Sequence, residues 1–167
     1  RDFSAPVTLI EQMSHDQLNV LGRYDPNLFN RWNALRQLSF DAIEKYIYSN
    51  ETISKRLLSS IEKTLCSDDL SYSYRALIAT PPSEQACLTY LYNRNKVIDP
   101  SSIYRAIQSF KKALSIQCNS FLNEFFCKYT SPIDYLPNAE QAGLRAFKLK
   151  LMDLFCNSND GDGVRIV

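Results

Sequence analysis

The stretch DPNLFNRWNALRQLSFDAIEKY, from Asp25 to Tyr46, decides the fold that we expect for this chain. Its apolar side chains recur at spacings of three and four, at Phe29, Trp32, Leu35, Leu38, Ala42, Ile43 and Tyr46. This period places them on one face of an α-helix of about six turns. Asp25 is expected to cap the helix, with Pro26 at its first position. The pattern therefore predicts a long amphipathic helix with Trp32 in the core and Arg31 beside it on the side that faces water.

Six further helices and one strand are predicted around this stretch. Helix signals cover residues 14–22, 52–66, 70–79, 84–92, 99–129 and 138–155, and Ser4 to Ile10 has the pattern of a short edge strand containing Pro6. Ser14 with Gln17, and Asn138 with Gln141, have the spacing of a capping box, while Ser83 and Asp99 are simple caps. The helix at 99–129 is expected to be the longest and central one. The fold class is all-α, a layered, solenoid-like array of six or seven antiparallel helices with one short N-terminal strand.

Composition and charge exclude several classes of protein. The chain has 167 residues, of which 45% are hydrophobic and 22% charged, so one ordered domain is expected. The 19 basic and 18 acidic residues nearly cancel, which argues against a nucleic-acid partner. No apolar run approaches the ~20 residues of a bilayer-spanning helix, so no membrane partner is expected.

The chain offers no recognisable catalytic or metal-binding motif. Its one histidine, His15, stands at a predicted helix start, where an exposed first-turn residue is the simplest interpretation. Zinc coordination by histidines alone is excluded, because the paired imidazoles of H-E-x-x-H need a second histidine. The cysteines at positions 66, 87, 118, 127 and 156 form no C-x-x-C pair. We interpret them as free thiols, mostly buried, in a reducing compartment, so no catalytic, cofactor-binding or metal-binding residue is assigned.

The aromatic residues allow two interpretations. The chain has ten tyrosines and nine phenylalanines, and Tyr72, Tyr74, Tyr90 and Tyr92 could form a binding surface. The preferred interpretation is that they fill interhelical space with their hydroxyl groups at the rim.

Four landmarks in order give the chain a family resemblance. They are Arg1-Asp2-Phe3-Ser4-Ala5-Pro6-Val7, Phe29-Asn30-Arg31-Trp32, Thr80-Pro81-Pro82-Ser83-Glu84 and Ile98-Asp99-Pro100. Together they resemble bacterial alanyl aminopeptidases of the aminopeptidase N type, where a β-sandwich gives way to the C-terminal helical domain. The resemblance implies that residues 1–12 are the tail of the β-sandwich domain and that residues 13–167 are the first part of the helical domain. The chain is then expected to be a segment of a longer protein.

The resemblance also implies a function. Members of this family are zinc metallopeptidases that release N-terminal amino acids from peptides, using G-A-M-E-N and H-E-x-x-H segments that this chain lacks. We expect this protein to be cytoplasmic. Zinc is therefore expected in the parent enzyme and none on this chain. The helical segment would cap the catalytic module, shape the substrate cavity, and contact the catalytic and β-sandwich domains of the same polypeptide. Peptide substrates would be reached through the parent, and the segment alone would be inactive.

A second hypothesis comes from the residues alone. A stand-alone helical adaptor that binds proteins or peptides would also have near-neutral charge, many aromatic residues and stacked helices.

Overall fold

The computed structural model describes residues 13–128 and 135–156, and all regular structure in these ranges is helical. The helices are α1 (His15–Tyr24), α2 (Leu28–Ser49), α3 (Lys55–Leu65), α4 (Tyr72–Ala79), α5 (Glu84–Asn93), α6 (Pro100–Gln117), α7 (Asn119–Lys128) and α8 (Ala139–Cys156). The all-α fold class is thus confirmed, with eight helices in the described ranges where six or seven were predicted. The strand predicted at Ser4 to Ile10 lies outside the described residues.

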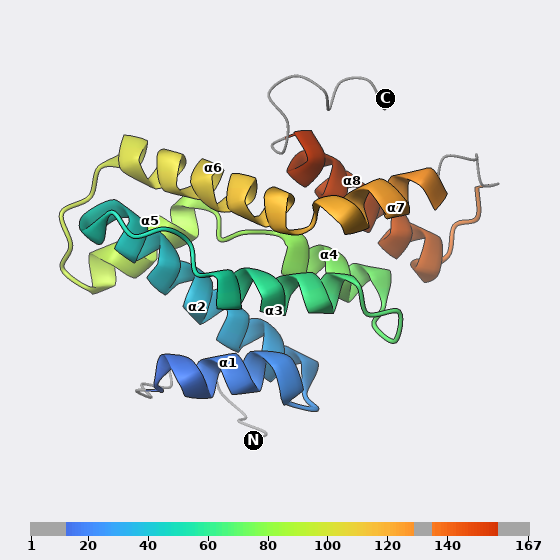
Figure 1. The fold of residues 1–167 in the computed structure, drawn as a ribbon, viewed down its shortest axis with the longest axis horizontal. Coiled ribbons are helices and arrows are strands. Elements are labelled where there is room, and N and C mark those ends of the chain that lie inside the picture. The colour runs from blue at the N-terminus through green and yellow to red at the C-terminus, as the bar shows by residue number, and fades with distance from the viewer. Residues whose placement is uncertain (1–12, 129–134, 157–167) are drawn as a thin grey trace.

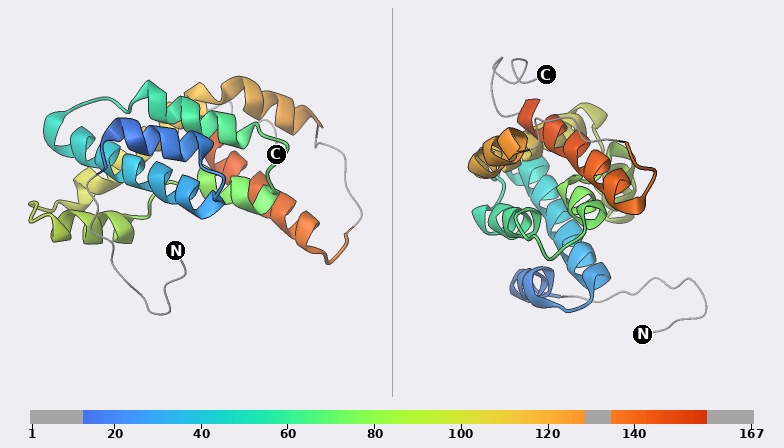
Figure 2. Two further views of the ribbon diagram at one scale, coloured as in Figure 1. Left: turned by 90° about the horizontal axis from the view of Figure 1, so that it is seen from below. Right: turned by 90° about the vertical axis from the view of Figure 1, so that its right-hand side faces the viewer.

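The helices pack in successive pairs, with longer-range contacts that join the pairs into layers. α1 packs on α2, α3 on α4, α5 on α6 and α7 on α8, while α4 against α8 is the most extensive contact between any two helices. Figure 1 shows α1 at one side of the array and α6, α7 and α8 at the other, and the right-hand view in Figure 2 keeps that order. α6 also contacts α2 and α3 and so ties the layers together.

Several caps are those that the sequence predicts. Ser14 and Gln17 form the complete capping box of α1, and the Ser83 hydroxyl accepts a hydrogen bond from the Ala86 N–H at the start of α5. Asp99 accepts from the N–H groups of Ser101 and Ser102, and Pro100 occupies the first turn of α6. These local hydrogen bonds satisfy orphan N–H groups, which is why the sequence signals hold.

The start of α2 corrects one prediction. Asn27, and not Asp25, is the N-cap, because its Oδ1 accepts from the Phe29 and Asn30 N–H groups. Asp25 supports the turn by accepting from the Asn27 N–H at 2.7 Å. Pro26 consequently precedes the helix instead of opening it. Asn caps a helix about as well as Asp, so the sequence pattern could not separate the two.

Three other boundaries also differ from the predictions. α1 continues past Gly22 to Tyr24. Gly22 lies inside the helix, where the absence of a side chain makes room for Leu35 of α2. α3 begins at Lys55 and not near Thr52. α4, predicted from residue 70, begins at Tyr72 with Ser71 as its cap.

The predicted long helix at 99–129 is two helices. It breaks at Cys118, whose backbone (φ −91°, ψ 7°) leaves the helical range, and a new helix begins at Asn119. Asn119 and Ser120 follow the break, and such short polar side chains compete with helical backbone hydrogen bonds. α2, with 22 residues, is therefore the longest helix in the described ranges. Figure 1 shows α7 following α6 along the same side of the molecule.

The core follows most of each predicted stripe. Leu35, Leu38 and Ile43 of the α2 stripe are buried, whereas Ala42 and Tyr46 are half-buried. The other helices bury the apolar residues Leu57, Leu58, Ile61, Leu65, Ile103, Ala106, Ile107, Phe110, Leu114, Phe125, Phe147, Leu151, Leu154 and Phe155. Phe29 is 65% exposed, and Trp32 is only half-buried. Both lie near the N-terminal end of α2, where the stripe extends past the helices that cover the rest of it.

Candidate functional site

The histidine and the cysteines were assigned no chemistry, and the structure shows where they lie. His15 is exposed and its Nε2 lies 3.1 Å from Asp41 Oδ2. Cys87 and Cys118 are buried, whereas Cys66, Cys127 and Cys156 are exposed, so the expectation of mostly buried thiols is wrong. Burial raises the pKa of Cys87 to about 11 and that of Cys118 to about 12, which keeps both as unreactive thiols.

The described residues include no set of side chains that could hold a metal ion. No group of three or more His, Cys, Asp or Glu side chains lies close enough to hold a metal ion among residues 13–128 and 135–156. The zinc that the family resemblance implies therefore does not fit the described part of this chain. That zinc is bound elsewhere in the parent stays a prediction.

Asp41, on the middle of α2, is the centre of a polar network that joins three helices. Besides His15 of α1, it accepts a hydrogen bond from the Tyr90 hydroxyl of α5. Burial, followed by this hydrogen bond to the Asp41 carboxylate, raises the pKa of Tyr90 well above its ordinary value. The phenol therefore stays protonated and acts as a fixed donor. Arg94 Nη1 in turn donates to the Tyr90 hydroxyl oxygen at 2.6 Å and pairs with Glu44.

An arginine and aromatic stack runs along the same helix. The Arg36 guanidinium carbon lies 5.0 Å from the Trp32 ring centre and 5.3 Å from the Phe40 ring centre. The Phe40 and Tyr90 rings are stacked at 4.7 Å, almost parallel. Since Trp32, Arg36 and Phe40 are spaced by four residues, they lie one turn apart on one face of α2. The sequence analysis placed Trp32 in the core and Arg31 on the water-facing side; the structure shows that Arg36 is a cationic neighbour of the Trp32 ring.

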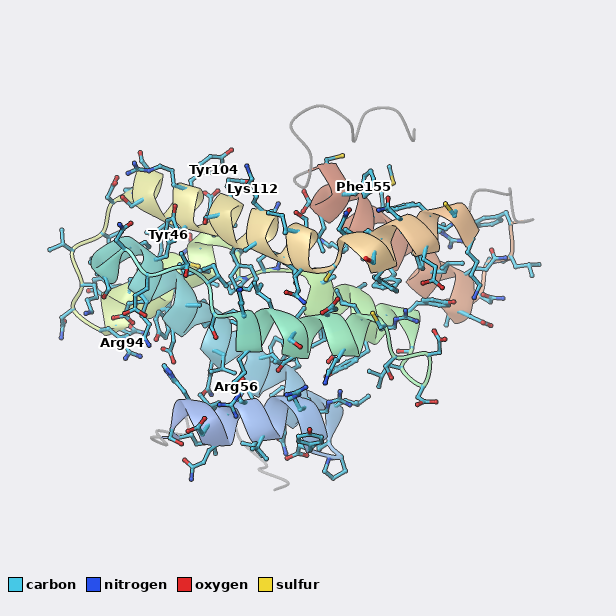
Figure 3. The ribbon with its side chains drawn as sticks, viewed as in Figure 1. Tyr46, Arg56, Arg94, Tyr104, Lys112 and Phe155 are labelled. Atoms are coloured by element: carbon cyan, nitrogen blue, oxygen red, sulfur yellow. The ribbon has the colours of Figure 1, made fainter. Side chains whose placement is uncertain are left out.

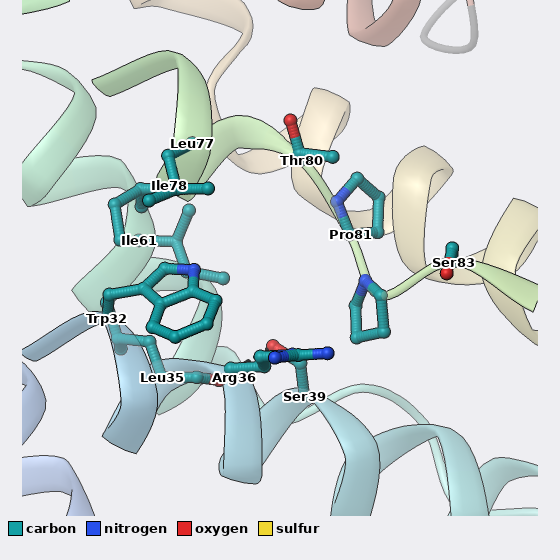
Figure 4. Close-up of a pocket in the computed structure, with 11 residues that line it drawn as sticks. Trp32, Leu35, Arg36, Ser39, Ile61, Leu77, Ile78, Thr80, Pro81 and Ser83 are labelled. Atoms are coloured by element: carbon teal, nitrogen blue, oxygen red, sulfur yellow. Dashed lines mark hydrogen bonds between the residues drawn. The ribbon is translucent and has the colours of Figure 1, made fainter. Parts of the chain in front are cut away.

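Trp32 and Arg36 form one wall of a cavity of about 220 Å³. Figure 4 shows the opposite wall, made by the connection from Thr80 to Ser83, with Ile61, Leu77 and Ile78 closing one end. Pro81 and Pro82 keep this connection extended, because each proline excludes helix at the residue before it. The lining is mainly apolar, with few polar groups to orient a ligand.

The cavity opens beside an exposed apolar surface, which we call the Trp32 face. It comprises Leu28 (39% exposed), Phe29 (65%), the half-buried Trp32 and Leu77 (46%). The Phe29 and Trp32 ring centres lie 5.6 Å apart, and the Tyr74 hydroxyl donates to the Leu28 carbonyl oxygen, so the residues belong to one surface across α2 and α4. Grouped exposed apolar side chains of this kind mark contact sites.

The four tyrosines mostly follow the packing interpretation. Tyr72, Tyr74 and Tyr90 pack against the core, whereas Tyr92 is 73% exposed. They do not gather into one binding surface, because Tyr74 contacts α2 near Leu28 and Tyr90 contacts Asp41 farther along it.

Sequence reasoning missed two features of this region. Asp41 and Arg36 lie at half-buried positions between the apolar residues of α2, and a charged residue at such a position is usually assigned to solvent. The four-residue spacing of Trp32, Arg36 and Phe40 was the available signal. No helix in the described ranges is long and apolar enough to cross a membrane.

Paired helices stacked in layers, with no catalytic cluster in the described ranges, define a helical repeat domain of the ARM type. The chain belongs to the family described as "Domain of unknown function (DUF3458_C) ARM repeats", which matches residues 15–167.

Two known proteins are similar to the chain over most of its length. It is 25% identical over 150 residues to aminopeptidase N of Caulobacter vibrioides, covering 89% of this chain and 17% of that protein. Its fold matches the crystal structure of Legionella pneumophila aminopeptidase A in complex with aspartic acid, with a TM-score of 0.75 and 22% identity, covering 98% of this chain and 19% of that one. The chain thus spans less than a fifth of the length of each relative.

These comparisons confirm the family resemblance that the four landmarks indicated. They favour a segment of an aminopeptidase over a stand-alone adaptor, because both relatives are aminopeptidases and both contain much additional chain.

Proposed function

We propose that this chain is a non-catalytic helical segment of a cytoplasmic zinc aminopeptidase, an enzyme that releases N-terminal amino acids from peptides. The observation that carries the proposal is the match of 89% of the chain to 17% of an aminopeptidase N. In the parent, the segment caps the catalytic module and forms part of the wall of the substrate cavity. The zinc and the catalytic residues belong to other parts of the polypeptide.

The domain division follows from the same proposal. Residues 1–12 are the end of a β-sandwich domain, and the helical domain begins at residue 13. The start of α1 at His15 supports a boundary at this point, because the Ser14 capping box fixes where the helix can begin.

The Trp32 face is the proposed contact with the other domains of the same polypeptide. More than four-fifths of each relative lies outside the segment that this chain matches. A parent of that length would supply other domains large enough to cover this face. Apolar side chains such as Phe29 would be costly to leave exposed and are stabilised by burial against such a partner.

The experiment uses the complete product of the native gene. Phe29→Ser with Leu77→Ser should loosen the helical segment, so that limited proteolysis cuts near it at least several times faster than in the wild type. The matched control is Leu149→Ser, an equally exposed leucine (66%) on α8 that lies outside the Trp32 face. Equal protection of the double variant and the wild type would exclude this face as the interdomain contact.

A further inference from the structure

The cavity beside the Trp32 face carries a positive charge that its described lining does not balance. Arg36 is the one ionisable side chain among the described residues that line it, and no Asp or Glu stands beside it there. None of the ion pairs in the described part of the chain includes Arg36. Arg56, by contrast, is paired with Asp16, and Figure 3 shows it between α1 and α3. Arg36 is therefore a half-buried cation that still lacks a counter-ion.

The surroundings of Arg36 leave its N–H groups available to a ligand. The Trp32 and Phe40 rings contact the guanidinium from the turns before and after it on α2, and such contacts use no N–H donor. Figure 4 shows the Arg36 side chain extending past the Trp32 ring toward the connection from Thr80 to Ser83. The planar donor edge of Arg36 thus borders the cavity.

The hydroxyl groups of the lining already take part in local hydrogen bonds. The Ser39 and Thr80 hydroxyls each donate to a carbonyl oxygen of their own helix, both at 2.8 Å. The Ser83 hydroxyl accepts from the Ala86 N–H. A ligand in this cavity therefore meets the guanidinium of Arg36 as its main polar partner, and an anionic acceptor is favoured.

The size and the apolar walls define the rest of the ligand. The apolar part of the lining includes Leu35, Ile61, Ile78, Pro81 and Pro82. The volume is about 220 Å³. An engineered apolar cavity of about 150 Å³ in another protein binds benzene, so a body of about five or six carbons fits here together with a carboxylate. One cation balances one negative charge, whereas a phosphate dianion would leave a charge unpaired among apolar walls.

We propose that this cavity binds a small organic monocarboxylate with an apolar body. The N–H groups of Arg36 donate to both carboxylate oxygens, the paired arrangement that a planar guanidinium favours. The hydrocarbon body packs against Ile61, Ile78 and the two prolines. In the parent proposed above, the cavity would lie at the edge of a domain contact, where small-molecule sites often occur. The inference rests on residues of this chain and does not depend on the aminopeptidase function.

The test uses the complete 167-residue chain, labelled with ¹⁵N, at neutral pH and constant ionic strength. Trp32 is the only tryptophan in the sequence, so its indole N–H signal reports on the cavity wall without ambiguity. The ligands are sodium 4-methylpentanoate, the uncharged 4-methylpentanamide of nearly the same shape, and inorganic phosphate. We expect saturable shifts of the Trp32 signal with 4-methylpentanoate, and binding of the amide weaker by about tenfold or more. No saturation with 4-methylpentanoate, equal affinity for the amide, or tighter binding of phosphate would overturn the proposal.

Two variants locate the effect. Arg36→Gln removes the cation and should weaken 4-methylpentanoate binding about tenfold, with the affinity for the amide nearly unchanged. The matched control is Arg23→Gln, because Arg23 is a half-buried arginine beside the Tyr24 ring of α1 and does not line this cavity.

A second variant keeps the test decisive if Arg36→Gln does not fold. Leu77→Glu places a negative charge at a lining position that is 46% exposed, where the fold tolerates a polar side chain. It should weaken binding of the carboxylate by repulsion and leave binding of the amide unchanged. Wild-type affinity for 4-methylpentanoate in either variant would contradict the assignment.

Discussion

Arg75 shows how a single charged residue is accommodated inside this helical array. It is 3% exposed, and its Nε donates to the Leu65 carbonyl oxygen at 2.7 Å while Nη1 reaches Asp68. The guanidinium also lies 4.7 Å from the Phe147 ring centre and within 6 Å of the rings of Tyr72 and Phe121. Arginine suits this position because its planar group can donate in its own plane and stack on rings at the same time.

Arg75→Lys should therefore destabilise the fold although it keeps the charge. The ammonium cannot reproduce the planar donors, so the Leu65 carbonyl at the end of α3 loses its partner. We expect a loss of about 1–3 kcal/mol in the free energy of unfolding, measured by urea denaturation. Arg145→Lys on the exposed side of α8 is the control and should change stability by less than about 0.5 kcal/mol. Similar effects of the two variants would show that the buried geometry of Arg75 contributes nothing.

Periodicity could not reveal residues such as Arg75 and Asn19. Sequence patterns assign charged and amide side chains to solvent, and only packing partners from distant helices make their burial favourable. For the apolar residues the same patterns succeed, since Leu35, Ile61 and Phe147 are buried wherever another helix covers the stripe. Phe29 was misassigned because nothing in the described ranges covers the stripe at that end.

At the scale of the elements, the starts of α1, α5 and α6 were predicted from their caps, whereas the break between α6 and α7 was not. Ser14, Ser83 and Asp99 act through residues two or three positions away, so the necessary information is local. The break at Cys118 is different, because α6 and α7 each follow their own packing partners and the apolar period continues across the break. A local pattern thus predicts one helix where packing produces two.

The Asp99 cap predicts a pH dependence. Its hydrogen bond from the Ser102 hydroxyl, with the Ser101 and Ser102 N–H groups and nearby Arg105, holds the pKa of Asp99 below its ordinary value of 3.8. A lowered folded-state pKa means that the stabilisation is fully present above the ordinary pKa and is lost as the pH falls through the folded value. Asp99→Asn keeps the cap without a titratable group. The wild type should lose stability relative to Asp99→Asn between about pH 5 and pH 2.

Urea unfolding of both proteins across this range measures the difference. The two proteins differ only at position 99, so the difference between their curves isolates Asp99. If the free energies of unfolding of the wild type and Asp99→Asn change in parallel with pH, the charge of the Asp99 carboxylate does not stabilise the cap.

The contact of α4 with α8 depends on a glycine. A Cβ at Gly143 would lie 2.6 Å from Ser73 Oγ and 3.1 Å from the Ser73 backbone nitrogen, and backbone cannot easily move away. Gly143→Ala should destabilise the chain by about 1–3 kcal/mol from overpacking, reduced by the roughly 1 kcal/mol that alanine gains in a helix. Thermal or urea unfolding measures the change.

Gly22 provides the matched comparison. A Cβ there would meet the flexible end of Leu35 at 2.9 Å, which can shift, so Gly22→Ala should cost less than Gly143→Ala. Adding Ser73→Ala to Gly143→Ala should recover part of the loss, because it removes the nearest atom. A neutral Gly143→Ala would refute the close-packing account of α4 and α8.

At the scale of the whole molecule, the helices form a stacked array with one polar junction at Asp41, one apolar Trp32 face and no metal-binding cluster in the described ranges. The sequence predicted the all-α array from helix signals and short connections, and the family from four landmarks. It could not predict the Trp32 face, because that face is formed by helices that meet only in the folded chain. This array has the helical repeat fold of the family to which the chain belongs.

The central claim is that this chain is a non-catalytic part of a zinc aminopeptidase. The most direct measurement compares the complete product of the native gene with this purified chain, for zinc content and for hydrolysis of alanine p-nitroanilide. The account predicts zinc and hydrolysis in the complete protein, and neither in the 167-residue chain. Stoichiometric zinc with aminopeptidase activity in this chain alone, or their absence from the complete protein, would contradict it.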